Sequence, residues 1–302
     1  MHKTVLILGG SGRFGRHASH AFAARGWEVR QFDRAHDNLW DAAWGAEVIV
    51  NAWNPPYPDW AAQVPKLTKQ VIEVAKVTNA TVIIPGNVYN YGIDTADVYD
   101  ENTPHLATNP LGRIRIEMET AYRSSGVQTI VLRAGDFIDT EASGNWFDMM
   151  MIPKVGKGKF TYPGNPDIEH AWAWLPDLTN AAAELAEIRN ELPVFSDIPF
   201  PGFTLTGHEL CEAVGVSLGR KVVLKNMGWL PLQIARPFWK MARYLLEMRY
   251  LWNKPHRIDG TKFLTLLPEF EFTSLEEALP LALEDHIHPD QAVTRGTDAV
   301  CA

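Results

Sequence analysis

The sequence predicts an α/β protein whose larger part is a doubly wound parallel sheet and whose smaller C-terminal part is an α+β lobe. Three observations support this prediction. Apolar runs typical of buried strands alternate with helical patterns as far as residue 135. A glycine-rich turn follows the first of these runs, and the alternation breaks after residue 136. We expect domains at 1–135 and 136–285, with some strands shared between them, and a frayed tail at 286–302.

The first unit of the chain is a strand, a turn, a helix and a second strand. Thr4 to Leu8 is apolar throughout, and the helical pattern from Arg13 to Arg25 ends at Gly26. A second strand runs from Trp27 to Phe32. Together they make a βαβ unit of about 30 residues, which is the context of a dinucleotide-binding turn. The sheet is therefore expected to be Rossmann-like.

The turn after the first strand has the spacing Gly-x-x-Gly-x-x-Gly. Glycine permits the positive φ of a tight turn and the close approach of a pyrophosphate, whose charge the helix N-terminus stabilises. Asp33 ends the second strand and can bind ribose hydroxyls, which favours NAD; Arg34 or Arg13 could instead hold the 2′-phosphate of NADP. The expected cofactor-binding residues here are Gly9, Gly10, Ser11, Gly12, Arg13, Phe14, Gly15, Asp33 and Arg34.

The order of motifs resembles the extended short-chain dehydrogenases/reductases, the NAD-dependent epimerase/dehydratase family. Residues 47–52 resemble the family's strand that ends in an Asn-Ala pair beside the cofactor. Residues 81–92 resemble the strand with the catalytic hydroxyl, and residues 101–104 resemble the Glu-x-x-Pro step before the active-site helix. The resemblance covers roughly residues 3–285 and implies that Asn51 and Ala52 flank the cofactor. Trp53 follows directly, and we expect it to contact ligand, which indicates a bulky apolar or aromatic substrate.

The first departure from the family lies in the active-site helix, which in the family opens with Tyr-x-x-x-Lys, the general acid/base and its pKa-lowering partner. Leu111 and Arg115 hold these places here, so the tyrosine role is vacant. Arg115 keeps the positive charge, and its alternative role is an i,i+4 ion pair with Glu119.

The catalytic Ser or Thr of the family is not evident either. Asn87 could polarise a substrate carbonyl, although it is also typical of a turn after a strand. Tyr89 and Tyr91 are the nearest phenols that could replace the missing acid, with packing as their alternative role. The candidate catalytic residues are therefore Asn87, Tyr89, Tyr91 and Arg115, and no metal site is predicted.

The second departure is a short connection between the second and third strands. Only 13 residues separate Asp33 from Glu47, too few for the helix and extra strand commonly found there. We expect a trimmed crossover in which residues 37–39 line the adenine, followed by a short strand or turn. The sheet should be smaller or rearranged at this edge.

The other predicted elements follow from periodicity and caps. The helices are expected at 60–78, 112–125 and 178–188, the last capped by Asp177, and the strands at 81–84, 128–132 and 170–175. Two capping boxes, at 206–209 and 274–277, should open helices near 207–218 and 275–284. The aromatic stretch 229–252 is interrupted by charges, which predicts an amphipathic helix packed on the protein; a membrane-surface helix is the alternative.

Composition limits the classes of partner. The chain has 302 residues with 28 Lys and Arg against 36 Asp and Glu, a net charge of −8, so no nucleic-acid partner is expected. Two cysteines cannot form a disulfide framework, and no signal peptide or spanning segment is visible. We therefore expect a cytoplasmic protein with a small-molecule substrate and no membrane partner; a homodimer is left open.

The leading hypothesis is an NAD(P)-dependent oxidoreductase, or an epimerase/dehydratase-like enzyme, that acts on a small carbonyl or hydroxyl compound without the usual Tyr-x-x-x-Lys pair. The vacant tyrosine position motivates the alternative, a non-catalytic NAD(P)-binding sensor or scaffold. A nucleotide-sugar enzyme is a weaker third hypothesis. It would need a pyrophosphate grip, for which the candidates are Arg220, Lys221, Arg236 and Arg257.

Overall fold

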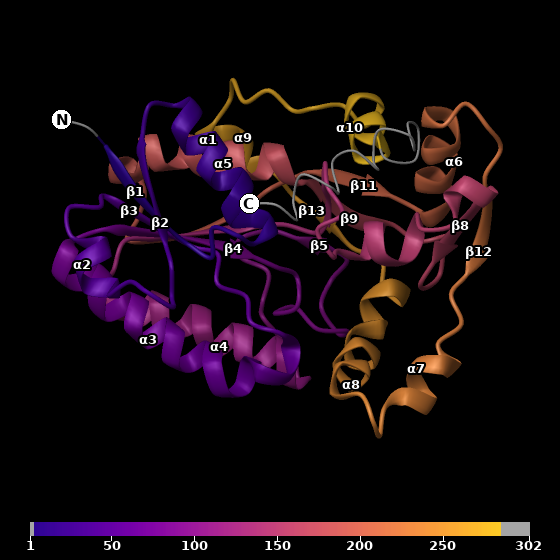
Figure 1. The fold of residues 1–302 in the computed structure, drawn as a ribbon, viewed down its shortest axis with the longest axis horizontal. Helices are drawn as coiled ribbons and strands as arrows, with labels where there is room; N and C mark the ends of the chain where they lie inside the picture. Colours follow the sequence, from indigo (N-terminus) through magenta and orange to yellow (C-terminus); the bar gives the residue numbers. More distant parts are fainter. Residues whose placement is uncertain (1–2, 285–302) are drawn as a thin grey trace.

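The computed structural model describes residues 3–284, and its centre is a six-stranded sheet (Figure 1). The strand order is β10–β6–β4–β3–β1–β2, and every neighbouring pair is parallel. The predicted Rossmann-like, doubly wound sheet is confirmed. Its strands are β1 (Thr4–Leu8), β2 (Glu28–Phe32), β3 (Val48–Asn51), β4 (Thr81–Gly86), β6 (Thr129–Arg133) and β10 (Phe195–Pro199).

Helices cover both faces of this sheet and make a three-layer structure (Figure 1). One face carries α1 (Arg13–Ala24), α5 (Leu175–Glu187) and α9 (Thr261–Leu266). The other carries α2 (Leu39–Ala43), α3 (Trp60–Thr78) and α4 (Pro110–Ser125). Successive side chains along each strand point alternately into the two apolar layers. For example, Ile7 packs with the α1 side and Leu6 with the α3 side.

The crossover between β2 and β3 is trimmed as expected. It contains one short helix, α2, so β2 is left as the edge of the sheet beside β1. Of the expected short strand or turn, no strand forms between β2 and β3, and turns at residues 34–36 and 44–45 flank the helix. Asn38 starts it: its side-chain oxygen accepts a hydrogen bond from the Trp40 amide at 2.9 Å.

The C-terminal part is built on smaller sheets. One has the order β11–β9–β7, from β7 (Asp136–Ile138), β9 (His170–Trp174) and β11 (Phe203–Leu205). A two-stranded parallel sheet joins β8 (Lys159–Tyr162) to β12 (Val223–Asn226), and another joins β5 (Val98–Tyr99) to β13 (Arg257–Ile258). The helices α6 (Gly207–Ser217) and α10 (Leu275–Ala282) pack on a separate apolar cluster that includes Trp172, Trp229 and Trp252. Since β10 and α5 belong to the central layers, the chain passes from this part back into the first.

Short helical turns complete the fold. They are the 3₁₀ turns η1 (Tyr57–Asp59), η3 (Val155–Lys157), η4 (Arg189–Glu191) and η5 (Met248–Asn253), and the π-helical turn η2 (Phe147–Met151). The predicted tail, 286–302, lies outside the described residues.

Two expectations for the C-terminal part are corrected. α5 begins at Leu175, directly after β9, and Asp177 does not cap it; Pro176 suits the first helical turn because its missing N–H needs no partner there. The stretch 229–252 is not one amphipathic helix. It is broken into α7 (Leu230–Ala235), α8 (Lys240–Glu247) and η5, with Pro237 between the first two. No helix within residues 3–284 has the length and apolar character needed to cross a bilayer.

Both predicted capping boxes are confirmed, and they carry a stability prediction. The Ser274 hydroxyl accepts from the Glu277 amide at 3.3 Å, and the Glu277 carboxylate accepts from the Ser274 amide at 3.0 Å. We expect Ser274→Ala to lower the free energy of unfolding by about 0.5–2 kcal/mol, measured by urea denaturation. Thr120→Ala, on the exposed side of α4, is the control and should change it by no more than about 0.5 kcal/mol. A Ser274→Ala protein as stable as the wild type would contradict the role of this cap.

Candidate functional site

The glycine turn after β1 is closed so tightly that it needs glycine at both ends. Gly9 has a φ of +81°, and the Gly12 amide donates to its carbonyl at 3.0 Å. A Cβ added at Gly15 would lie 2.2 Å from the Gly9 oxygen, which no side chain can do without moving backbone. Gly12 is the N-cap of α1 and no side chain caps this helix, so its first amides face the turn.

The end of β3 lies against this turn. A Cβ at Gly9 would be 3.0 Å from the Ala52 carbonyl oxygen and 3.4 Å from Cδ1 of Trp53. Trp53 also packs edge-to-face on Phe32, at the end of β2. Asn51 turns the other way, since its side-chain amide donates to the Tyr122 hydroxyl on α4 at 3.0 Å. Trp53 and Ala52 therefore border the turn, and Asn51 does not reach it through that amide.

The rest of the predicted cofactor set is spread around the same turn. Phe14 is buried in the core below α1, while Ser11 and Arg34 are exposed. The Arg13 guanidinium donates to the Gly144 carbonyl at 3.0 Å, so it ties the turn to the C-terminal part. The Asp33 carboxylate is exposed at the end of β2. A hydrogen bond with His36, helped by one from the Ala35 amide, lowers the pKa of Asp33, which keeps this carboxylate ionised.

Two phenols meet at the carboxyl ends of β3 and β4. The hydroxyls of Tyr89 and Tyr57 lie 2.6 Å apart, and both rings pack against Trp60. Burial raises the pKa of Tyr57 and of Tyr89, so both are neutral at physiological pH. Tyr57, in the turn η1, was missed by sequence reasoning because no periodic pattern marks that loop.

Arg115 lies beside this pair. Its guanidinium sits over the Trp60 ring at 4.5 Å and contacts the Asn54 side-chain oxygen at 3.4 Å. The alternative of an i,i+4 ion pair between Arg115 and Glu119 is wrong, because Glu119 instead forms hydrogen bonds with Arg133. A small recess joins Arg115 to Trp53. The arginine in the family's lysine position thus faces the end of β3.

Asn87 and Tyr91 have structural partners. The Asn87 side-chain oxygen accepts from the Tyr89 amide at 3.0 Å, which is the expected turn geometry. Tyr91 is fully buried and stacks on Tyr99 with ring centroids 3.9 Å apart, and its hydroxyl points to the Asp100 carbonyl. Neither side chain joins the Tyr57–Tyr89 pair, and the turn and packing alternatives describe them.

Asp136 and His170 form a second polar pair, from the starts of β7 and β9. A carboxylate oxygen of Asp136 lies 2.8 Å from His170 Nε2. The His170 ring is buried, stacked flat on Trp252 at 4.3 Å and in contact with His256. Burial is the main cause of the raised pKa of Tyr57, and the Asp136 charge adds to it.

Beneath these pairs lies a buried charge network. Arg133, at the end of β6, donates to Asp197 at 3.0 Å and to Glu119 at 2.8 Å, and its side chain is fully buried. His105 approaches Glu119 at 4.0 Å. Ligand atoms of His105, Glu119 and Asp197 lie within 4.8 Å of one another, but Arg133 occupies both carboxylates. The cluster therefore joins β6, α4 and β10 beneath the site.

The helix that carries Arg115 is capped from far away in the sequence. Asn109 is the N-cap of α4 but makes no side-chain capping bond. Instead the Glu247 carboxylate, at the end of α8, accepts from the Leu111 amide at 2.8 Å and from the Asn109 side-chain amide at 2.9 Å. α8 also packs on η1, which holds Tyr57.

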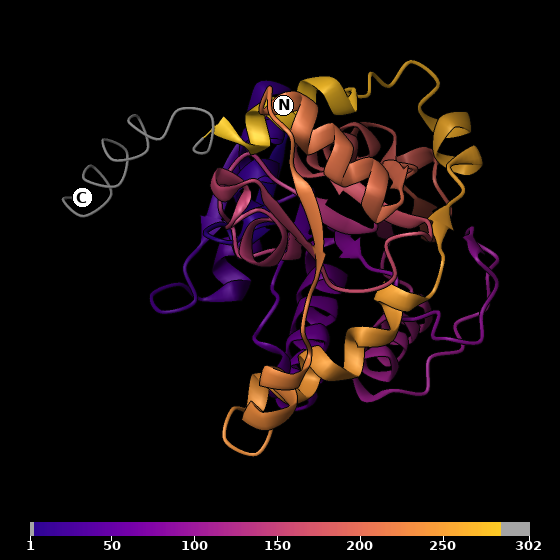
Figure 2. The same cartoon turned by 90° about the vertical axis from the view of Figure 1, so that its right-hand side faces the viewer.

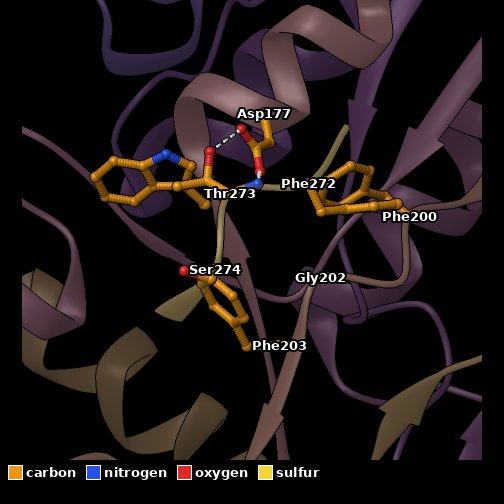
Figure 3. A pocket seen from close by; sticks show the side chains of 8 residues that line it. Asp177, Phe200, Gly202, Phe203, Phe272, Thr273 and Ser274 are labelled. Atoms are coloured by element: carbon orange, nitrogen blue, oxygen red, sulfur yellow. Dashed lines mark hydrogen bonds between the residues drawn. The ribbon is translucent and has the colours of Figure 1, made fainter. Parts of the chain in front are cut away.

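A separate cavity lies elsewhere, in the C-terminal part (Figure 3). Its volume is about 250 Å³, and it is lined by aromatic side chains that include Phe200 and Phe272. Among its polar lining residues, Asp177 accepts from the Thr273 amide and hydroxyl, each at 2.7 Å. None of its lining residues belongs to the glycine turn or to the two polar pairs.

Comparisons with known proteins rest on structure alone. No family model and no curated protein sequence matches the chain. Solved structures do. A human epimerase family protein, crystallised with NADPH, is 19% identical with a TM-score of 0.72, covering 93% of this chain and 99% of that one. UDP-glucose 4-epimerase from Brucella ovis, in complex with NAD, is 15% identical with a TM-score of 0.69, covering 94% and 98%.

A third structure is a GalE-like L-threonine dehydrogenase from Cupriavidus necator, 16% identical with a TM-score of 0.72 over 95% of this chain and 99% of that one. The chain has the fold of an extended short-chain dehydrogenase/reductase. The resemblance drawn from the motifs is thus confirmed for the fold, across both the sheet and the C-terminal part.

Proposed function

We propose that the protein is an NAD(P)-dependent oxidoreductase, or an epimerase/dehydratase-like enzyme, that acts on a small carbonyl or hydroxyl compound. The observation that carries the proposal is the glycine turn, where the missing Cβ of Gly15 leaves room for backbone to close under a pyrophosphate. The neighbours crystallised with NAD or NADPH support the same cofactor class. A bound nicotinamide would accept or donate the hydride.

The residues around the turn fit a dinucleotide. The first amides of α1 and the turn backbone would hold the pyrophosphate, and Ala52 and Trp53 would lie alongside it. The ionised Asp33 carboxylate would accept from ribose hydroxyls and repel a 2′-phosphate, which favours NAD. Because Arg13 is engaged with Gly144, Arg34 is the cation left to favour NADP.

The two polar pairs supply the proton chemistry. Tyr89 and Tyr57 are neutral, so they would donate a hydrogen bond to a substrate oxygen rather than act as bases. In the oxidising direction, the substrate hydroxyl proton would pass to the Asp136 carboxylate, which His170 holds in place. The positive charge of Arg115 would stabilise developing negative charge on the substrate oxygen.

The surroundings favour an apolar or aromatic substrate. Trp53 and Trp60 line the region where the phenols and Arg115 meet. The four candidate cations for a nucleotide-sugar pyrophosphate lie in three separate segments: Arg220 and Lys221 are adjacent and Arg220 donates to the Gly156 carbonyl, whereas Arg236 follows α7 and Arg257 begins β13. This distribution supports the first hypothesis over the third.

Removal of one hydroxyl tests the catalytic assignment. With NADH or NADPH and a panel of apolar ketones and aldehydes, turnover is followed by loss of reduced-nicotinamide absorbance. We expect Tyr89→Phe to lower kcat by about 100-fold or more without changing cofactor affinity. Tyr99→Phe is the matched control, since the Tyr99 hydroxyl has no hydrogen-bond partner within residues 3–284, and it should retain full activity.

The alternative function is a non-catalytic NAD(P)-binding sensor or scaffold. The specific observation that favours it is Leu111, which has no proton to donate in the family's tyrosine position. Tight cofactor binding by calorimetry, with no turnover on the whole carbonyl panel and no exchange of label from solvent into a bound hydroxyl substrate, would establish it and overturn the enzyme proposal.

A further inference from the structure

The helices α7 and α8 form a projection, here called the α7–α8 hairpin and comprising residues 230–247 (Figure 2). Its large apolar side chains are exposed: Leu230 at 64%, Ile234 at 66%, Phe238 at 91% and Trp239 at 49%. Leu230 and Ile234 are four residues apart and share one side of α7, and Phe238 and Trp239 follow in the turn. Water-exposed apolar side chains gathered at one projection indicate a contact surface.

The hairpin is also the basic part of an acidic protein. The hairpin contains three cations, Arg236, Lys240 and Arg243, and one acid, Glu247, whereas the chain as a whole has a net charge of −8. Arg236, Lys240 and Arg243 are exposed on the hairpin, and none of the ion pairs found among residues 3–284 involves them. The surroundings of the apolar tip therefore attract anions.

The occupant that fits both properties is an anionic lipid surface. Exposed Phe, Trp and Ile flanked by Lys and Arg are the composition of segments that lie in a membrane interface. The shape agrees, because a convex projection can enter a deformable interface without a matching groove (Figure 2). A symmetric contact between two copies is disfavoured, since it would bring the basic hairpins together.

We propose that the α7–α8 hairpin docks the protein on anionic bilayers, with Phe238 and Trp239 inserted among the headgroups and Arg236, Lys240 and Arg243 at the lipid phosphates. This replaces the sequence expectation of no membrane partner with its alternative of a membrane-surface helix. The proposal does not depend on the catalytic one.

Vesicle flotation with the full-length protein tests it. We expect the protein to float with vesicles of phosphatidylcholine and phosphatidylglycerol but not with phosphatidylcholine alone, and added salt to weaken the association. Ile234→Ser combined with Phe238→Ser should lower the partition coefficient by about tenfold or more, because less apolar surface enters the bilayer. The matched control is Val216→Ser on α6, whose side chain is 74% exposed and should not matter.

The charges are tested separately. Lys240→Glu with Arg243→Glu should abolish flotation, whereas Lys66→Glu with Lys69→Glu, two exposed positions on α3, should not. Thermal melting of each variant verifies folding. The proposal is overturned if the wild type fails to float with anionic vesicles, or if the hairpin variants float like the wild type. It is likewise overturned if Phe238→Ser turns a dimer into a monomer while lipid binding is unchanged, because the hairpin would then bind a second copy.

Discussion

Gly15→Ala is expected to abolish binding of NAD and NADP. The new Cβ would sit 2.2 Å from the Gly9 oxygen and 2.9 Å from the Gly10 Cα, so the turn that receives the pyrophosphate must open. Isothermal titration calorimetry should show a loss of affinity of more than about 100-fold, or about 2.7 kcal/mol.

A second variant separates the cofactor site from folding. At Gly12 a Cβ would meet only the Gly9 oxygen, at 3.2 Å, so Gly12→Val should leave the fold in place and still block the approach of the phosphates. Gly156→Ala is the control, since a Cβ there meets nothing within 4 Å. Unchanged NAD and NADP affinity in folded Gly12→Val protein would refute the cofactor site.

Arg133→Met should be the most destabilising substitution proposed here. It removes the guanidinium that satisfies Glu119 and Asp197 and leaves two buried carboxylates facing each other. Breaking a buried pair from one side costs about 3–5 kcal/mol, so the urea midpoint should fall sharply. Arg113→Met, at an exposed position on the same helix as Glu119, should cost no more than about 0.5 kcal/mol.

The pH dependence of this variant has a definite sign. In the wild type, burial raises the pKa of Glu119, but the Arg133 charge and hydrogen bond outweigh it, so the pKa is lowered. The stability that Glu119 contributes is therefore present above its unfolded pKa and is lost as the pH falls through the folded pKa. In Arg133→Met no arginine charge offsets the effect of burial, so the pKa of Glu119 rises. The deficit relative to the wild type should shrink as the pH falls from about 7 to about 5; a constant deficit would contradict the network.

The sheet was predictable because its signals are local. The apolar run before Gly9, the helix over 60–78 and the capping boxes at Thr206 and Ser274 each arise within one segment, and the structure contains all of them. The trimmed crossover was also predictable, because the 13 residues between Asp33 and Glu47 hold one short helix and leave no room for a further strand.

The sequence named Tyr89 and Arg115 individually, but the polar pairs of the site depend on contacts between distant segments that it did not reveal. Asp136 and His170 are 34 residues apart, and Tyr57 and Tyr89 are 32 apart, so no spacing rule joins either pair. The ion pair with Glu119, given as the alternative role of Arg115, has the i,i+4 spacing of a helical pair, but Glu119 instead binds Arg133, which approaches from β6. Spacing rules within one helix cannot predict which of two arginines will bind a carboxylate when the second comes from a distant strand.

Glu247 connects the hairpin to the candidate site, because it lies at the end of α8 and binds the first turn of α4. Its carboxylate replaces the cap that α4 lacks, so a shift of α8 that withdrew it would leave the first turn of the helix carrying Arg115 with an unsatisfied amide. A partner that bound the hairpin and withdrew Glu247 from α4 would then change the affinity of the proposed site at Arg115. By thermodynamic reciprocity, ligand at Arg115 must change the affinity of the hairpin for its partner by the same factor.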